Sequence, residues 1–391
     1  MPVQNYDVLI AGGGITGVAL AFFLASNKDF KGRVAIIEPD PTYRMAATPK
    51  SAGGIRQQFS TRENILMSRF AVEFIKDAPY LLEVNGIRPA LEFKERGYLF
   101  MAKDGSALAD LCDFQCALGA SIHLLEGEML RSKFPWLNCE DLAVSTFGSK
   151  GEGWIDPYAL LQAFRAKAKS LGVDFIKDEV RDIHMEKNRV MGVTLLQGGR
   201  IACGVLVNQT GVQARNLAAM VNLDLPVFPK KRCVFVFACR EDLSSAPLCI
   251  DPSGVWWRPE SGQYICGISP PLEKDPTTTE EDIDQNLFDE IIWPILAHRV
   301  PAFQAIKPTN AWAGHYDYNV FDQNVLIGPA SSPENFYFAN GFSGHGLQQA
   351  PAIGRALSEL ILYNGYRSLD LSALSYARYI ANNPIIERHV V

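Results

Sequence analysis

Residues 6–17 read YDVLIAGGGITG, and this stretch decides the fold. The apolar run 6–11 predicts a short buried strand, and the three glycines after it predict a tight turn. The apolar residues from Ile15 to Ser26 predict a buried helix directly after that turn. A second apolar run, 33–37, predicts a strand that ends at Glu38, so the N-terminal segment is a strand–helix–strand unit.

The glycines of this unit match the pattern G-x-G-x-x-G, and an acidic residue follows about 20 positions later. The first glycine permits the turn, the second lets a pyrophosphate approach the backbone, and the third lets helix and strand pack closely. The helix N-terminus offers unpaired N–H groups to a phosphate, and the acid accepts hydrogen bonds from a ribose. We therefore predict a dinucleotide site formed by Gly12, Gly14, Ile15, Thr16, Gly17, Glu38 and Pro39. A close-packed unit without a ligand would explain Gly17, but not Gly13, Gly14 and Glu38 together.

Residues 341–351 read GFSGHGLQQAP and form a second glycine-rich stretch. They stand between a strand-like run, 336–339, and a helix-like run, 347–364, which ends at the stop signal Asn364-Gly365. A glycine loop can bring its backbone against a flat ligand, and the helix N-terminus that it delivers favours negative charge. A tight strand-to-helix connection without a ligand is the alternative interpretation.

Composition limits the partners of the chain. The net charge is −6 and no strongly basic segment occurs, so we expect no nucleic-acid partner. The uncharged run 8–27 is long enough to imitate a membrane span, but Asp7 precedes it and glycines split it, so we expect no transmembrane segment. The eight cysteines form no Cys-x-x-Cys pair, which favours buried thiols in a reducing compartment over a metal site. We expect a cytoplasmic protein, or a mitochondrial matrix protein if a transit peptide was removed.

Three further segments carry local signals. Asp156 and Pro157 predict the N-cap and first position of a helix. The segment 189–210 has the alternation of a hairpin that turns at 198–199. Residues 277–284 are polar and acidic, which predicts a solvated loop followed by the start of a helix.

Four stretches in order, 7–25, 46–60, 204–211 and 335–361, resemble the D-amino-acid oxidase/sarcosine oxidase superfamily of flavoproteins. They read DVLIAGGGITGVALAFFLA, AATPKSAGGIRQQFS, GVLVNQTG and NFYFANGFSGHGLQQAPAIGRALSELI. Shorter stretches are similar to one subgroup, the FAD-dependent oxidoreductase domain-containing protein 1 family. These are SAGGIRQQFSTRENI, KFPWLN, GEGWIDPYALLQAFRAKA, KRCVFVF, IDPSGVWWRPE and AWAGHYDYNVFDQN.

The resemblance implies an α/β fold of the glutathione-reductase-like FAD/NAD(P)-binding type. A Rossmann-type FAD-binding domain (1–90, 151–221 and 313–391) would interleave with a mixed α+β substrate domain (91–150 and 222–312). The FAD contacts implied beyond the N-terminal unit are Ser51, Ala52, Gly53, Val180, Thr210, Gly211, Gly341, Phe342, Ser343, Gly344, His345, Gly346, Leu347 and Gln348. The cysteine and histidine to which relatives link the flavin are absent, so we expect non-covalent FAD.

The resemblance also implies oxidation of the C–N bond of an amino acid or N-substituted amino acid by hydride transfer to flavin. Arg56 or Arg258 would hold the carboxylate of such a substrate. The catalytic candidates are Arg56, Arg258, Tyr264, His315, Tyr316, Tyr318 and His345. For Arg56, His345 and the residues of the 315–318 cluster, a purely structural role is the alternative. The lysines that relatives use near the flavin are missing, with Gln348 at one of the positions, which favours a dehydrogenase over an oxidase.

Two other functions stay open at this point. The subgroup that the chain resembles includes a mitochondrial relative linked to the assembly of respiratory complex I. This relative implies a flavin-stabilised assembly or scaffold factor, in which FAD would serve folding. An NAD(P)H-dependent flavin reductase would need a second dinucleotide motif, and the sequence contains none. The small-molecule substrate and the electron acceptor, oxygen or a redox partner, are not identified by the sequence.

Overall fold

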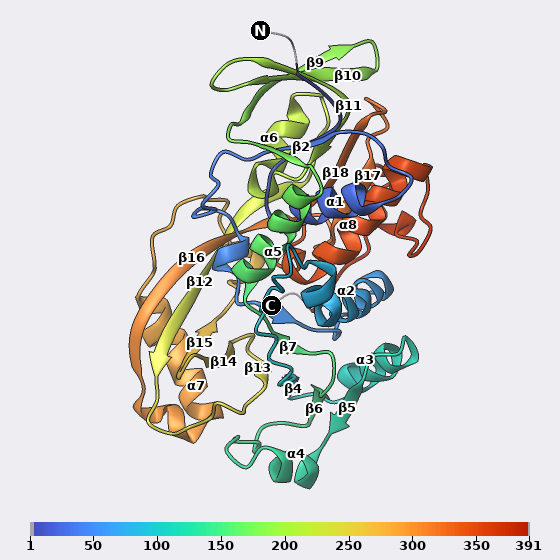
Figure 1. Ribbon diagram of the computed structural model, residues 1–391. Helices are drawn as coiled ribbons and strands as arrows, with labels where there is room; N and C mark the ends of the chain where they lie inside the picture. Colours follow the sequence, from blue (N-terminus) through green and yellow to red (C-terminus); the bar gives the residue numbers. More distant parts are fainter. Residues whose placement is uncertain (1–3, 390–391) are drawn as a thin grey trace.

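Two eight-stranded sheets organise the chain in the computed structural model, which describes residues 4–389 apart from the side chains of Ser106 and Leu272 (Figure 1). The first sheet has the order β17-β18-β11-β1-β2-β8, and β10 and β9 extend it beside β11. Its strands are β1 (Gln4–Ala11), β2 (Val34–Ile37), β8 (Asp174–Ile176), β9 (Val180–Glu186), β10 (Arg189–Leu195), β11 (Arg200–Asn208), β17 (Leu326–Pro329) and β18 (Phe336–Asn340).

The centre of the first sheet is parallel and buried. β1 pairs in parallel with β2 on one side and with β11 on the other, and β18 continues the parallel order beyond β11. Leu9 and Ile10 are fully buried, and each such side chain stabilises the fold by about 1.5–3 kcal/mol. Burial on both faces explains why the last four residues of β1, 8–11, are continuously apolar, and the arrangement confirms the predicted α/β class.

The second sheet has the order β16-β12-β15-β14-β13-β4-β6-β5. Its strands are β4 (Tyr98–Ala102), β5 (Ile122–Leu125), β6 (Val144–Gly148), β12 (Val227–Ala238), β13 (Leu248–Ile250), β14 (Trp256–Glu260), β15 (Gln263–Gly267) and β16 (Lys307–Asn319). A short pair, β3 (Gly54–Ile55) with β7 (Gly153–Trp154), lies outside both sheets. The division into two domains stays a prediction, and its boundary at 312/313 falls inside β16.

The α-helices are α1 (Ile15–Ser26), α2 (Arg62–Leu81), α3 (Ser106–Ala117), α4 (Gly127–Lys133), α5 (Pro157–Ser170), α6 (Ala214–Ala219), α7 (Trp293–Arg299), α8 (Gly346–Tyr363) and α9 (Ala377–Ile380). Short 3-10 turns span Thr48–Lys50, Gly211–Gln213, Leu272–Lys274, Pro301–Ala305 and Ser372–Leu374, and Leu287–Ile292 is π-helical. Figure 1 shows α1 beside α8, with α2 and α5 close by. At Gly354 of α8 an added Cβ would lie 2.7 Å from the carbonyl carbon of Ala19 in α1, so the two helix backbones touch.

Local sequence signals are confirmed at several ends of these elements. α1 spans Ile15–Ser26, the predicted range. The Asp156 carboxylate caps α5 by accepting from Ala159 N at 2.9 Å. α8 ends at Tyr363, and the residue that caps it is Asn364, which has φ +53°. The prediction that a helix starts at the end of the segment 277–284 is wrong, because the next regular element begins at Leu287.

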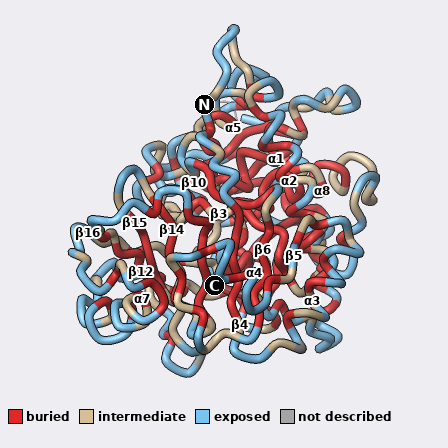
Figure 2. Tube along the Cα trace, turned by 90° about the horizontal axis from the view of Figure 1, so that it is seen from below, coloured by how far each residue is buried: buried red, intermediate tan, exposed pale blue. Residues whose placement is uncertain are grey.

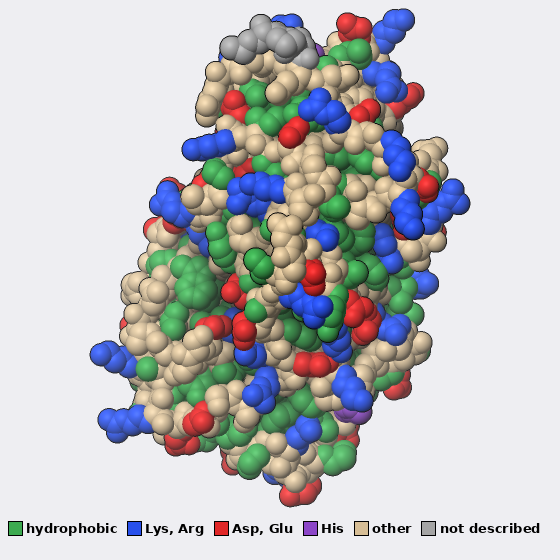
Figure 3. Space-filling model, viewed as in Figure 1, with side chains coloured by type: hydrophobic (Ala, Val, Ile, Leu, Met, Phe, Trp, Pro, Cys, Tyr) green, Lys and Arg blue, Asp and Glu red, His purple; other side chains and the backbone are tan. Residues whose placement is uncertain are grey.

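Burial divides the chain into a continuous interior and a charged surface. Figure 2 shows buried segments running through the centre, with exposed segments at the periphery. On the face in Figure 3, acidic and basic side chains are interspersed. Within residues 4–389, no helix has both the length and the apolar character needed to span a bilayer, and all eight cysteines are free thiols.

Candidate active site

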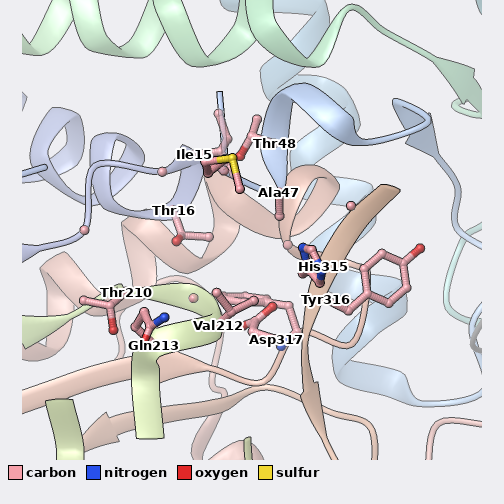
Figure 4. A pocket seen from close by; sticks show the side chains of 18 of the residues that line it. Ile15, Thr16, Ala47, Thr48, Thr210, Val212, Gln213, His315, Tyr316 and Asp317 are labelled. Carbon is pink, nitrogen blue, oxygen red and sulfur yellow. Dashed lines mark hydrogen bonds between the residues drawn. The ribbon is translucent and has the colours of Figure 1, made fainter. Parts of the chain in front are cut away.

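A cavity of about 680 Å³ opens between the ends of the first-sheet strands and the strands β12, β14 and β16 of the second sheet; it is called the large cavity below. Figure 4 shows Thr210 and Gln213 at one end of it and His315 and Tyr316 at the other. The nucleotide end is formed by the β1–α1 turn, residues 38–43 and 178–180 and the segment after β11. The ring end is formed by residues 45–52, 232–234, 256 and 268–269, by β16 and by the start of α8.

Main-chain contacts define the nucleotide end. Gly12 has φ +102°, and an added Cβ would lie 2.2 Å from the carbonyl oxygen of Gln209. At Gly17 an added Cβ would lie 2.1 Å from the carbonyl oxygen of Gly12, so α1 can start so close to the turn only with glycine. Gly14 has φ −62° and no atom within 4 Å of an added Cβ, and it lines the open cavity. The first and third glycines therefore serve packing, while the second leaves space for a ligand.

The carboxylate of Glu38, at the end of β2, braces the glycine turn. It accepts from Gly13 N at 2.9 Å and from Asp40 N at 2.9 Å. Burial raises the pKa of Glu38, and the hydrogen bonds from Asp40 and Gly13 oppose that shift. Because Glu38 also lines the cavity, its carboxylate is available to a ribose on the side away from the turn.

The walls of the large cavity hold polar groups that have no partner among the described residues. Gly14 caps α1 and His345 caps α8 without a side-chain hydrogen bond, so both helix N-termini keep unsatisfied N–H groups beside the cavity. The hydroxyl of Tyr43 and both amide atoms of Gln209 and Asn340 are buried without a hydrogen-bond partner. These three residues line the cavity from the nucleotide end to the ring end. Uncapped helix ends and unpartnered donors along one long cavity fit an extended dinucleotide.

Side chains from distant segments form the ring end. At Gly344, which has φ +97°, an added Cβ would lie 2.5 Å from Cε2 of Tyr316, so the ring of Tyr316 packs directly on the glycine loop. Asp317 accepts from Gly341 N at 2.8 Å and from Phe342 N at 3.2 Å, which holds the loop against β16. Burial raises the pKa of Asp317 to about 6, although these backbone hydrogen bonds act in the opposite direction.

The two histidines of the site are neutral at pH 7. Burial lowers the pKa of His315, and Lys50 and Lys231 lower it further; its Nε2 lies 2.9 Å from the carbonyl oxygen of Glu280. Because a carbonyl can only accept, Nε2 of His315 carries the hydrogen and Nδ1 is the acceptor. Burial and then Arg56 lower the pKa of His345 to about 3, and its Nε2 lies 3.2 Å from Nη2 of Arg56. Arginine only donates, so His345 uses its lone pair on Arg56.

The structure brings many of the predicted site residues to the large cavity. Those that line it are Gly12, Gly14, Ile15, Thr16, Glu38, Pro39, Ser51, Ala52, Val180, Thr210, Gly211, His315, Tyr316, Phe342, Gly344, Gly346 and Leu347. Those that do not line it are Gly17, Gly53, Arg56, Arg258, Tyr264, Tyr318, Gly341, Ser343, His345 and Gln348. Several of the second group support the walls: Gln348 Oε1, for example, accepts from Arg56 N at 2.8 Å.

Two predicted tyrosines lie elsewhere. Tyr264 is 4% exposed in the core of the second sheet, where its hydroxyl donates to the carbonyl of Glu241 at 3.0 Å and accepts from Leu243 N at 2.8 Å. Both bonds are internal, so the structure removes Tyr264 from the candidate site. Tyr318 lines a second cavity of about 400 Å³, which shares Arg232 and Ser269 with the large one.

Sequence reasoning missed several residues of the ring end. Lys50, Arg232, Cys233, Val234, Trp256, Ile268 and Ser269 line it. Lys50 forms an ion pair with Glu281. Glu281 belongs to the acidic segment 277–284, for which we predicted a solvated loop. No local signal identified the missed residues, because the consecutive residues Arg232, Cys233 and Val234 all reach the cavity and the alternation along β12 does not separate them.

No group of three or more His, Cys, Asp or Glu residues within the described part of the chain could hold a metal ion. Cys233 reaches the cavity wall, but burial raises the pKa of its thiol, so it is protonated and weakly nucleophilic at pH 7.

Comparisons with known proteins agree with this geometry. Residues 7–360 match the DAO family, described as FAD dependent oxidoreductase. The FAD-dependent oxidoreductase domain-containing protein 1 of Xenopus laevis is 39% identical over all of this chain and 86% of its own length. The glycine oxidase of Geobacillus kaustophilus is 28% identical over 96% of this chain and 98% of its own. The crystal structure of L-proline dehydrogenase from P. horikoshii superposes with a TM-score of 0.87 at 25% identity, covering 98% of this chain and 100% of that one.

These matches cover nearly the whole chain, including both glycine-rich loops and the strands between them. The cofactor that fits the large cavity is accordingly FAD, and the relatives with named activities are amino-acid oxidases and dehydrogenases. The chain belongs to the DAO family of FAD-dependent oxidoreductases.

Proposed function

We propose that the chain oxidises the C–N bond of an amino acid or an N-substituted amino acid. The relatives named glycine oxidase, dimethylglycine dehydrogenase and L-proline dehydrogenase support this substrate class. The observation that carries the proposal is the mixed wall of the ring end, where apolar Val234, Trp256 and Ile268 line the same cavity as polar Lys50, Arg232 and His315. Apolar walls with a few polar and charged side chains beside a flavin suit a small substrate that carries both apolar and polar groups.

The residues present determine how FAD is held. Gly12, Gly14 and the N-terminus of α1 would bind the pyrophosphate, and Glu38 the ribose. Bound FAD supplies a hydride acceptor at the ring end. The N–H groups at the start of α8, together with the positive end of the helix dipole, would favour negative charge on the ring of bound FAD.

The chain promotes the reactive form of the amine through the wall of the ring end. An amine donates hydride from the adjacent carbon when its nitrogen is neutral. Lys50 and Arg232 line the ring end, but each is paired with a carboxylate, Glu281 and Asp275 respectively. The apolar side chains Val234, Trp256 and Ile268 reduce the solvation of a charged amine, and this desolvation lowers the pKa of a bound ammonium group. His315, neutral and with Nδ1 as its acceptor, adds a group at the cavity wall that can take up the released proton.

FAD is proposed to be bound without a covalent bond. Cys233, the cysteine that lines the large cavity, carries a protonated thiol, so it is not set up to attack the ring. Acid precipitation of the holo-protein should release the flavin into the supernatant; flavin that stays in the pellet would contradict the assignment.

We also propose that the chain is a dehydrogenase and that its electron acceptor is a redox partner. Reduced flavin should then be reoxidised only slowly in air.

The decisive experiment is the visible spectrum of the holo-protein without oxygen, before and after addition of N-methyl and D- and L-amino acids. Bleaching of the oxidised-flavin bands by one compound identifies the substrate class. If dithionite bleaches the flavin but no amine does, the function is refuted for this substrate class, and a flavin-stabilised assembly factor becomes the better explanation.

A further inference from the structure

Arg56, one of the two arginines expected to hold a substrate carboxylate, is engaged by other parts of the chain. It is 4% exposed, and its guanidinium donates to the carbonyls of Gln58 and His389. Its Nη2 lies 3.2 Å from Nε2 of His345, and its guanidinium carbon lies 4.0 Å from the ring centre of Phe59. Since Arg56 does not line the large cavity, these contacts make it a support for the glycine loop.

Arg258, the other expected anchor, is held mainly by its own strand. Its Nε donates to the carbonyl of Ala52 at 2.8 Å, its Nη1 donates to the carbonyl of Pro259 at 2.8 Å, and it forms an ion pair with Glu260. Arg258 lines neither cavity. Arg56 differs from it, because one of its partners stands 333 positions away in the sequence.

That distant partner, His389, belongs to the C-terminal segment 385–389, which is called the tail below. The ring of His389 stacks on that of Phe100 in β4, with ring centres 4.9 Å apart and planes at 22°. At the other end of the tail, Ile385 N donates to the carboxylate of Asp322 at 3.1 Å. The tail is therefore fastened at both ends, to the second sheet and to the turn between β16 and β17.

The carboxylate of Glu387 fastens the middle of the tail. Glu387 is fully buried, and its Oε1 accepts from N and Oγ of Ser60 at 2.8 and 2.6 Å. Its Oε2 accepts from Oγ1 of Thr61 at 3.0 Å and from Nδ2 of Asn64 at 2.9 Å. Burial acts to raise the pKa of Glu387, but the hydrogen bonds from Ser60 and Asn64 outweigh it and lower the pKa to about 2. The tail thus binds the start of α2 through a charged carboxylate.

Two routes lead from the tail to the start of α8. In the first, Asn64 donates to Glu387 and accepts from Nε2 of Gln349 in α8 at 2.9 Å. In the second, the guanidinium of Arg56 joins the tail to Nε2 of His345, the residue that precedes α8. Both routes end within one helical turn of the residues of α8 that line the ring end.

On this basis we propose that the tail is a positioning element of the ring end: Glu387 anchors it, and its carbonyl contact with Arg56 fixes His345 at the start of α8. The inference goes beyond the proposed function and does not depend on the substrate, because it concerns the surroundings of the FAD ring. A side chain locked by a further layer of hydrogen bonds keeps one orientation. N–H groups held in place at a helix start need no rearrangement when negative charge develops beside them.

The tail also affects the charge of His345. Burial and then Arg56 lower the pKa of His345 to about 3, and Glu387 acts in the opposite direction. The other titratable groups that act on Arg56 are Tyr98, Glu152 and Tyr316. Without the tail, water would reach the pair of Arg56 and His345 and weaken both the desolvation and the repulsion. The pKa of His345 should then rise toward the ordinary histidine value of about 6.5.

The test compares wild-type protein with a variant that ends at Pro384, both loaded with FAD. Histidine NMR, in which His345→Gln identifies the signal, should show His345 neutral down to about pH 5 in wild type. In the shortened variant the pKa of His345 should be at least about one unit higher, and FAD should bind about tenfold more weakly. A peptide of residues 385–391 at about 1 mM should reverse both changes, whereas the same peptide with Glu387→Gln should not.

Two full-length variants complete the test. Glu387→Ala removes the acceptor that fastens the tail, so it should reproduce both changes even if the shortened chain does not fold. Ile386→Ala is the matched control, because Ile386 is the neighbouring tail residue and is 55% exposed. It should change FAD affinity by less than about threefold and leave the titration of His345 unchanged.

Two results would overturn the proposal. One is a titration of His345 in Glu387→Ala that matches wild type, even if FAD binds more weakly, because the tail would then serve stability alone. The other is an equal effect of Ile386→Ala and Glu387→Ala. Neither measurement requires turnover, so the inference can fail while the proposed oxidation stands, and the oxidation can fail while the inference stands.

Discussion

The two ends of the large cavity are built in different ways. At the nucleotide end, contacts between main-chain atoms of β1, α1 and β11 set the shape, and the glycine turn fits directly against the carbonyl of Gln209. At the ring end, side chains such as Tyr316 and Arg232 set the shape, and they come from segments far apart in the chain. Figure 4 shows both ends together.

The difference separates two tasks. A main-chain surface hardly changes when side chains are exchanged, so the nucleotide end suits a cofactor that never varies. A surface of side chains can be altered one residue at a time, so the ring end suits the choice of substrate. Four predictions test this contrast, from the largest expected effect to the smallest.

The first prediction compares two glycines of the same turn. Gly12→Ala should lower the free energy of unfolding by about 3 kcal/mol or more and abolish FAD binding, because the methyl group meets the Gln209 carbonyl at positive φ. Gly14→Ala should change stability by less than about 0.5 kcal/mol, since its φ is ordinary and its surroundings are empty. It should still weaken FAD binding about tenfold or more, because the methyl group points into the cavity.

Urea unfolding and FAD titration of the apo-protein measure both effects. Equal losses of stability in the two variants would show that the turn as a whole, and not the contact with Gln209, limits substitution.

The second prediction concerns rescue at the ring end. Gly344→Ala should cost about 1–3 kcal/mol, because the methyl group meets the ring of Tyr316 and φ is +97°. The obstacle is a side chain, so Tyr316→Ala should recover part of that loss, with a coupling energy of about 0.5–3 kcal/mol in a double-mutant cycle. Strictly additive effects would mean that backbone strain alone is responsible. No comparable rescue is expected for Gly12→Ala.

The third prediction is a pH dependence at the ring end. Burial raises the pKa of Asp317 to about 6, so between about pH 4 and pH 6 the folded protein keeps a proton that the unfolded chain has lost. The free energy of unfolding contributed by this group therefore falls as pH rises through that window. Across this pH window the free energy of unfolding of wild-type protein should fall by about 2 kcal/mol more than that of Asp317→Asn, a figure that allows for water in the cavity.

The measurement is urea unfolding of both proteins across that pH range, because taking the difference cancels the other titrating groups. A difference that is constant with pH would show that the Asp317 carboxyl titrates normally in the folded state.

The fourth prediction concerns the acidic segment over the ring end. The ion pair of Lys231 with Asp282 joins side chains that are 20% and 68% exposed, so Lys231→Met should cost less than about 1 kcal/mol. Added salt should abolish even this difference. A larger, salt-resistant loss would mean that the segment is a rigid part of the cavity wall.

The same contrast explains what the sequence could predict. The glycines, the helix and Glu38 lie within one short stretch, where spacing alone fixes their relation, and the bounds of α1 were predicted correctly. Arg56 was placed near the flavin because it follows the 51–54 segment, but the sequence does not tell where its guanidinium points. Arg232 and Trp256 reach the cavity only because β12 and β14 are neighbours of β15, which local patterns do not reveal.

The contact between Gly354 in α8 and Ala19 in α1 has a consequence for divergence among related chains. One of these helices begins at the nucleotide end and the other at the ring end, and where they touch, the spacing is set by main-chain atoms. At this point the spacing is set by the two backbones and not by the size of a side chain at position 354, so substitutions elsewhere in the core leave this contact in place. Relatives that share only two residues in five can therefore keep the same span for the same cofactor, provided that the glycine stays.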